Sequence, residues 1–175
     1  MAKTKEQLLN ILDQFQLTEK VVSAEPFGNG HINDTLKVTN EKGEIKYVLQ
    51  RINHLIFTNV DMLQNNIHVV TTHIRKKLEE KGETDIDRKV LTFLPTKDGK
   101  KYYFDGDSYW RVCLFIPRSK SYEEVTPELS YEAGKAFGDF QTMLSDIPEG
   151  TLGETIPDFH NMEFRLRQFH EAVAA

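Results

Sequence analysis

Two segments of the chain carry residues whose types and spacing suit phosphate binding. The first is Gly28-Asn29-Gly30, which lies between two segments that alternate as strands, 21–27 and 32–39. Because glycine has no Cβ, backbone N–H groups in such a turn can approach phosphate oxygens closely. The same residues also predict an ordinary hairpin turn, since Asn-Gly is a strong hairpin signal. Taken alone, the turn favours the hairpin.

The second segment is the alternating stretch 45–52, which places a cation in an otherwise apolar strand. Val48 and Ile52 share one face of this strand, and Leu49 and Arg51 share the other. The Arg51 guanidinium could reach a phosphate bound beneath the glycine turn, because its planar fork of donors matches phosphate oxygens. A solvent-facing arginine on an edge strand is the alternative interpretation.

The remaining elements must position these two segments. Turns at 28–30 and 40–43 predict that the first three strands form an antiparallel meander. An amphipathic helix is expected before them, within residues 1–16, and a long helix after them, capped by Thr58 or Asn59 and ended near Gly82. Further strands are expected at 90–94, 102–105 and 109–116. The Asp105-Gly106-Asp107 segment predicts a turn between two of these strands, with a metal site as the alternative.

The order of elements predicts an α+β fold, and the composition changes near Pro117. Thr126-Pro127-Glu128 is a strong helix start, with a capping threonine followed by proline at the first helical position. Residues 160–174 are expected to be helical again. Pro117 is therefore the best candidate for a boundary within the chain.

Composition and charge limit the classes of protein that the chain can belong to. Its 175 residues include 22 basic and 27 acidic side chains, so the formal net charge is −5. Without a dense basic face, we expect no nucleic-acid partner. No apolar run is long enough to span a membrane, and the single cysteine, Cys113, excludes an internal disulfide. We therefore expect a packed protein of the cytoplasm with no membrane partner.

Several motifs together resemble the aminoglycoside phosphotransferase superfamily, and most closely its N-acetylhexosamine 1-kinase branch. Two of them are Phe27-Gly28-Asn29-Gly30-His31-Ile32-Asn33-Asp34-Thr35 and Tyr47-Val48-Leu49-Gln50-Arg51-Ile52-Asn53-His54. Residues 57–66, residues 109–117 and the proline–acid step at 156–160 are similar to the same branch. The resemblance covers nearly the whole chain.

The resemblance implies a protein-kinase-like fold with two lobes. Residues 1–117 would form the small lobe, an antiparallel sheet with one long helix, and residues 118–175 would begin the helical large lobe. Such enzymes transfer the γ-phosphoryl group of ATP to a small-molecule hydroxyl with the help of Mg²⁺. Arg51 would replace the phosphate-binding lysine, and residues 115–117 would form the hinge beside adenine. The residues that the resemblance assigns to nucleotide binding are Gly28, Asn29, Gly30, His31, Asn33, Thr35, Arg51, Phe115, Ile116 and Pro117.

His31 has a second assignment, because it follows the glycine turn and would point toward the cleft. There it could contact the acceptor sugar, and a solvent-facing turn residue is the alternative. The chain also departs from the family at the long helix, which usually supplies a carboxylate to the phosphate-binding cation. Here the facing positions hold Gln64, Asn65 and Asn66, so the usual ion pair is in question.

The larger departure concerns catalysis. None of the six histidines begins the pattern His-x-Asp-x-x-x-x-Asn, so no catalytic residue and no metal ligand is assigned. We expect these residues beyond Ala175, which makes the chain the ATP-binding half of a sugar 1-kinase, inactive alone. Alternatives are a kinase of choline, homoserine or an aminoglycoside, or a non-catalytic nucleotide- or partner-binding module. Phe137, Phe140 and Met143 are expected on an exposed face that favours self-association.

Overall fold

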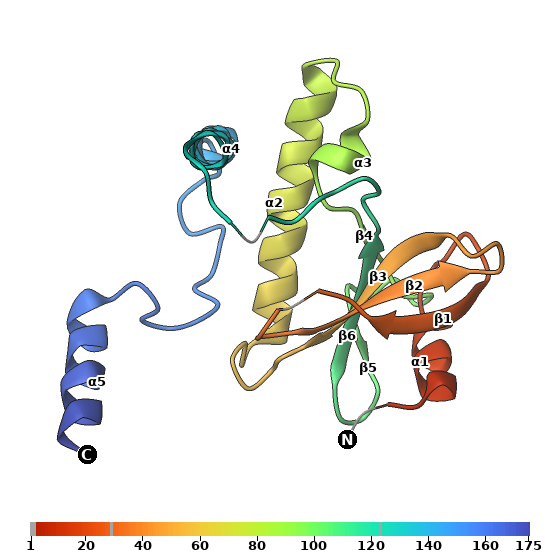
Figure 1. Cartoon of the computed structure of the whole chain (residues 1–175), viewed down its shortest axis with the longest axis horizontal. Coiled ribbons are helices and arrows are strands. Elements are labelled where there is room, and N and C mark those ends of the chain that lie inside the picture. The colour runs from red at the N-terminus through yellow and green to blue at the C-terminus, as the bar shows by residue number, and fades with distance from the viewer. Residues whose placement is uncertain (1–2, 29, 123) are drawn as a thin grey trace.

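The computed structural model describes residues 3–28, 30–122 and 124–175 of the chain. Within this part the fold is α+β, with six antiparallel strands in one sheet and five helices (Figure 1). The strands follow the order β1-β2-β3-β6-β4 across the sheet, and β5 also pairs with β6. Their bounds are β1 Val21–Pro26, β2 Asp34–Asn40, β3 Ile45–Ile52, β4 Phe93–Leu94, β5 Tyr103–Phe104 and β6 Tyr109–Leu114.

Strands β1, β2 and β3 form the antiparallel meander that their two turns predict. The side chain of Asn40 holds the second turn, because its Oδ1 accepts hydrogen bonds from the N–H groups of Lys42 (3.0 Å) and Glu44 (2.9 Å). Gly43 takes the left-handed conformation, with φ of 80°. Local bonding of this kind helps to fix the register between β2 and β3.

Helix α1 (Lys5–Leu12) covers one face of the sheet. Thr4 caps it in a capping box, in which the Thr4 hydroxyl accepts a hydrogen bond from the N–H of Gln7 and the Gln7 side chain accepts one from the N–H of Thr4. The core on this face consists of Leu8, Ile11, Leu12, Phe15, Val38, Tyr47, Leu49, Trp110 and Val112. Residues two apart on a strand point to the same face, because successive residues point to opposite faces. Leu49 lies in the core beside α1, so Arg51 of the same strand also lies on the α1 face.

The long helix α2 (Val60–Glu80) packs on the opposite face. Asn59 caps it by accepting a hydrogen bond from a first-turn N–H at 2.9 Å, and Gly82 follows its end with φ of 68°, so both expected limits are confirmed. Ile52 of β3 packs with Leu63 of α2. Burial of each such aliphatic side chain contributes about 1.5–3 kcal/mol through the apolar surface removed from water.

The expected strand at 90–94 is wrong in its first half. The chain forms the short helix α3 (Ile86–Lys89) just before it, and only β4 pairs with β6. Val90 is buried against α2, so its apolar side chain reflects packing on a helix and not pairing in the sheet. Hydrophobic pattern alone does not distinguish these two environments in a short segment.

Two further helices follow the sheet. Helix α4 (Pro127–Leu144) begins where expected, with the Thr126 hydroxyl accepting a hydrogen bond from a first-turn N–H at 3.3 Å. Helix α5 (Met162–Ala174) lies apart from the sheet in Figure 1, and no residue of either helix is buried. Among the described residues, none of the helices has the length and apolar character that a membrane crossing requires.

The C-terminal end of α4 packs against α2. Lys77 of α2 donates a hydrogen bond to the Met143 carbonyl at 2.7 Å and pairs with Asp146. The expectation that Met143 belongs to the exposed apolar face is wrong, because its side chain packs against the buried cluster that α2 forms with Val90. Phe137 and Phe140 are exposed, at 70% and 42% of their full accessible surface.

Candidate functional site

The turn between β1 and β2 is shaped by backbone bonding and by one glycine. The N–H of Phe27 donates to the Thr35 carbonyl at 2.9 Å, which closes the paired part of the hairpin. Gly28 has φ of 80°, a conformation that other residues rarely adopt. Gly30 has no such constraint, and a Cβ added there would meet no atom within 4 Å, so the fold itself does not require glycine at this position. Asn29 lies outside the described residues.

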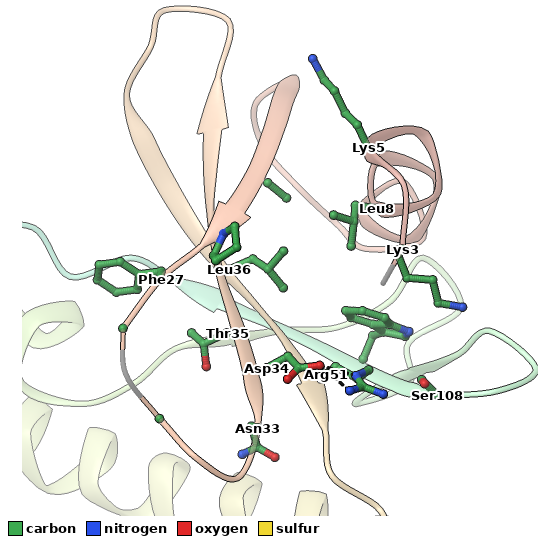
Figure 2. Close-up of a pocket in the computed structure, with 15 residues that line it drawn as sticks. Lys3, Lys5, Leu8, Phe27, Asn33, Asp34, Thr35, Leu36, Arg51 and Ser108 are labelled. Carbon is green, nitrogen blue, oxygen red and sulfur yellow. Dashed lines mark hydrogen bonds and ion pairs between the residues drawn. The ribbon is translucent and has the colours of Figure 1, made fainter. Parts of the chain in front are cut away.

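The turn borders a groove of about 730 Å³ that the hairpin shares with α1, as Figure 2 shows. The residues assigned to nucleotide binding that line it are Gly28, Gly30, Asn33, Thr35 and Arg51. Lys3, Lys5 and Asp34 line it too, so its wall carries three cations and one carboxylate. His31 is exposed on the turn and does not line the groove. The groove therefore unites the glycine turn with Arg51, although the two are separate in sequence.

Arg51 is held by a carboxylate from the neighbouring strand. Its Nε lies 2.6 Å and its terminal NH2 2.5 Å from Oδ2 of Asp34, its cross-strand partner in β2. Both side chains are partly exposed, at 44% and 62%, so the pair contributes little stability and can exchange for another anion. Arg51 lies on the α1 face of the sheet, opposite to α2, and its carboxylate partner is Asp34 of β2.

A row of polar side chains crosses the opposite face, which α2 covers. Gln50 of β3 donates from Nε2 to the Thr35 hydroxyl at 3.0 Å and accepts at Oε1 from Nε of Arg111 at 3.0 Å. Burial lowers the pKa of the Arg111 guanidinium, and its NH1 nitrogen is buried with no hydrogen-bond partner in the described part of the chain. The row thus connects a buried positive charge to Thr35 at the glycine turn.

The sequence pattern alone did not assign Gln50 or Arg111 to a site. Alternation along β3 does place Gln50 on the same face as Ile52, so the face on which Gln50 lies could be predicted from the sequence. The pairing of Gln50 with Arg111 joins positions 61 residues apart and depends on the register between β3 and β6. That register is a property of the assembled sheet.

The segment expected to act as a hinge lies next to the glycine turn. The ring of Phe115 meets the ring of Phe27 edge to face, with centroids 5.9 Å apart. Within the chain, the N–H of Phe115 donates to the Lys46 carbonyl at 2.9 Å, and the carbonyls of Ile116 and Pro117 accept from Ser119 and Arg88 respectively. Within residues 3–28, 30–122 and 124–175, the Phe115 carbonyl and the Ile116 N–H form no such bond, so they are the acceptor and donor that the segment could offer to a base.

The turn between β5 and β6 is a structural turn. Burial of Asp105 would raise its pKa, but the ion pair with Lys3 and the hydrogen bonds from Ser108, Trp110 and Asp107 outweigh burial and lower the pKa to about 2. Its carboxylate oxygens are thus occupied by donors, which favours the turn interpretation over a metal site. Among the described residues, no three His, Cys, Asp or Glu side chains converge as metal ligands would.

No protein-family model matches the chain.

Proposed function

We propose that this chain is the ATP-binding half of a small-molecule kinase with a protein-kinase-like small lobe, similar to the N-acetylhexosamine 1-kinase branch of the aminoglycoside phosphotransferases. One observation carries the proposal: assigned residues from three separate segments meet at one place. Gly28, Gly30 and Arg51 line one groove, and Phe115 contacts Phe27 at its edge. A triphosphate with an attached base needs such an arrangement, with donors and a cation at one end and an apolar wall with free backbone groups at the other.

In this proposal the glycine turn binds the phosphates through backbone N–H groups, because a Cβ added at Gly30 would meet no atom of the described residues beyond its chain neighbours within 4 Å. Arg51 exchanges Asp34 for a phosphate oxygen, since a partly exposed ion pair is easily replaced by a second anion. Adenine lies against the ring of Phe115 and bonds to the backbone of residues 115–116. Mg²⁺ enters with the nucleotide and neutralises phosphate charge.

The acceptor in this proposal is the anomeric hydroxyl of an N-acetylhexosamine. His31 stands on the exposed side of the turn, where a sugar bound against the phosphates could be reached. The sequence contains no His-x-Asp-x-x-x-x-Asn segment, so the proposal assigns no base for this hydroxyl and expects the chain to bind ATP without completing the transfer.

Calorimetry of the purified chain with ATP and Mg²⁺ tests the proposal. We expect one site per chain with a dissociation constant between about 1 μM and about 1 mM, which corresponds to about −8 to −4 kcal/mol. Adenosine should bind more weakly than ATP, because it lacks the phosphates that the turn and Arg51 contact. Absence of any ATP binding at about 10 mM would refute the proposal. Incubation with radiolabelled ATP and N-acetylglucosamine should give no phosphorylated sugar, and robust turnover would show that the assignment of the catalytic residues is wrong.

A further inference from the structure

A second cavity, of about 440 Å³, lies between α2 and the β4 edge of the sheet. It shares no lining residue with the groove at the glycine turn. In the sheet, β4 forms one edge, and the β1–β2 hairpin that carries the glycine turn forms the other. The polar residues that line this cavity include Gln64, His68, Thr72, Arg75 and Lys101. The proposed nucleotide site therefore does not account for it.

A buried side chain with an unused donor lines this cavity. Gln64 is only 3% exposed, and its Nε2 has no hydrogen-bond partner among the described residues. Leaving a buried amide donor unpaired destabilises the folded state, and such groups in folded proteins are nearly always bonded. The cavity that Gln64 lines is far larger than the space of one water molecule. A ligand with an acceptor oxygen would satisfy the donor.

The charge around the cavity selects an anion. Arg75 and Lys101 line it, and none of its lining residues is a carboxylate. Asp87, which lies outside the lining, neutralises Arg75 through an ion pair at 2.6 Å, so Arg75 contributes little free charge. Lys101 donates to the side-chain oxygen of Asn65 at 3.1 Å and forms no ion pair with a described residue, so its charge is not neutralised there. The buried guanidinium of Arg111 lies 5.3 Å from the ring centroid of Phe93, which also lines the cavity. The exposed ammonium of Lys101 and the buried guanidinium of Arg111 both favour a bound anion, and Arg111 does so more strongly than it would in water.

The rest of the lining is apolar, so a ligand that fits the cavity needs an apolar part as well as a negative charge. Ile67, Leu91, Phe93, Leu94 and Pro95 form this part of the wall. A bare inorganic anion would leave these side chains without contacts, whereas an organic anion buries apolar surface against them. We propose that the cavity between α2 and β4 binds a small organic anion, whose charged oxygens accept from Gln64 and Lys101 and whose apolar body packs on Phe93. This site is independent of the proposed nucleotide site.

Titrations followed by NMR chemical shifts test this proposal with four probes: phenyl phosphate, benzoate, inorganic phosphate and the neutral benzyl alcohol. The two organic anions should bind most tightly, and should do so equally well in the presence of saturating ATP. Lys101→Met should weaken their binding about tenfold, or about 1.4 kcal/mol. The matched control Lys76→Met removes a cation from the outer side of α2, where Lys76 is 73% exposed, and should leave binding unchanged.

Gln64→Leu provides a second variant that should fold at least as well as the wild type, because it removes the unpaired buried amide. We expect it to raise the melting temperature and to abolish the response to both organic anions. Equal binding of benzyl alcohol and benzoate, unchanged affinity in both cavity variants, or displacement of the anions by ATP would each overturn the proposal. A chain that binds the anions but not ATP would refute the nucleotide site alone.

Discussion

The carboxylate of Asp105 organises the β5–β6 turn, and its replacement by asparagine should destabilise the protein. Oδ2 pairs with the ammonium of Lys3 at 2.8 Å and accepts from the indole N–H of Trp110 at 2.8 Å. Oδ1 accepts from the backbone N–H groups of Ser108 (2.8 Å) and Asp107 (3.0 Å). An asparagine can keep the oxygen that faces the two backbone donors. Its NH2 group then faces the lysine and the indole, both of which are donors.

The magnitude follows from the pKa of this carboxyl. The pKa lies at about 2, against an ordinary value of 3.8, and the side chain is only 9% exposed, so solvent screens its contacts little. Each pKa unit corresponds to about 1.4 kcal/mol, so ionisation of Asp105 stabilises the folded state by about 2 kcal/mol. The unpaired indole donor and lysine in Asp105→Asn raise the expected loss to about 2–3 kcal/mol.

Urea unfolding followed by tryptophan fluorescence measures this loss. Trp110 is the single tryptophan of the chain and is 2% exposed, so its emission reports unfolding directly. Because the folded pKa of Asp105 lies below the unfolded one, its contribution is complete above an unfolded pKa of about 3.8 and is lost as the pH falls toward 2. The difference between wild type and variant should therefore be largest at neutral pH and shrink steadily as acid is added.

Asp107→Asn is the matched control, because it makes the same chemical change two residues away. The Asp107 carboxylate accepts from the Ser108 hydroxyl at 2.9 Å, and the described part of the chain shows no ion pair for it. This control should cost less than about 1 kcal/mol. If Asp105→Asn unfolded within about 0.5 kcal/mol of the wild type at neutral pH, or if the difference did not depend on pH, the account of this turn would be refuted.

Three further predictions concern the groove and the contact of α4 with α2. Gly30→Ala should leave the midpoint of urea unfolding unchanged and weaken ATP binding at least tenfold. Gly28→Ala should lower the free energy of unfolding by about 1 kcal/mol, because φ at this position is positive. Equal effects of the two variants on stability would contradict the geometry of the turn. Arg51→Met should change stability by less than about 0.5 kcal/mol and weaken ATP more than adenosine, and an equal loss for both ligands would show that it does not contact phosphate. Lys77 holds the pKa of Asp146 at about 2, so the amides at the C-terminal end of α4 should lose protection from exchange in Lys77→Met. The wild type should lose the same protection as the pH falls from 4 toward 2, since this contribution is lost below the unfolded pKa. Protection that is insensitive to both changes would refute the docking role of the pair.

Several features of the fold follow from residues that act locally, and these could be predicted from the sequence. The alternation of 45–52 is confirmed over the full length of β3, since a period of two reflects the pleat of a single strand. The caps at Asn59 and Thr126 are confirmed because each side chain bonds to a backbone N–H three residues away. The alternation within this one strand likewise predicted that Leu49 and Val48 point to opposite faces.

Other features depended on which strands and helices became neighbours, and no local pattern contains that information. The sequence shows that Arg51 and Ile52 point in opposite directions, but only the packing of α1 and α2 decides which helix each of them meets. The bond between Gln50 and Arg111 requires the β3–β6 register. The buried amide of Gln64 becomes a donor in a cavity only because α2 crosses the β4 edge. The sequence therefore determined the elements and their faces, while tertiary structure decided which charges are buried and which are exposed, because burial is set by contacts between segments far apart in the chain.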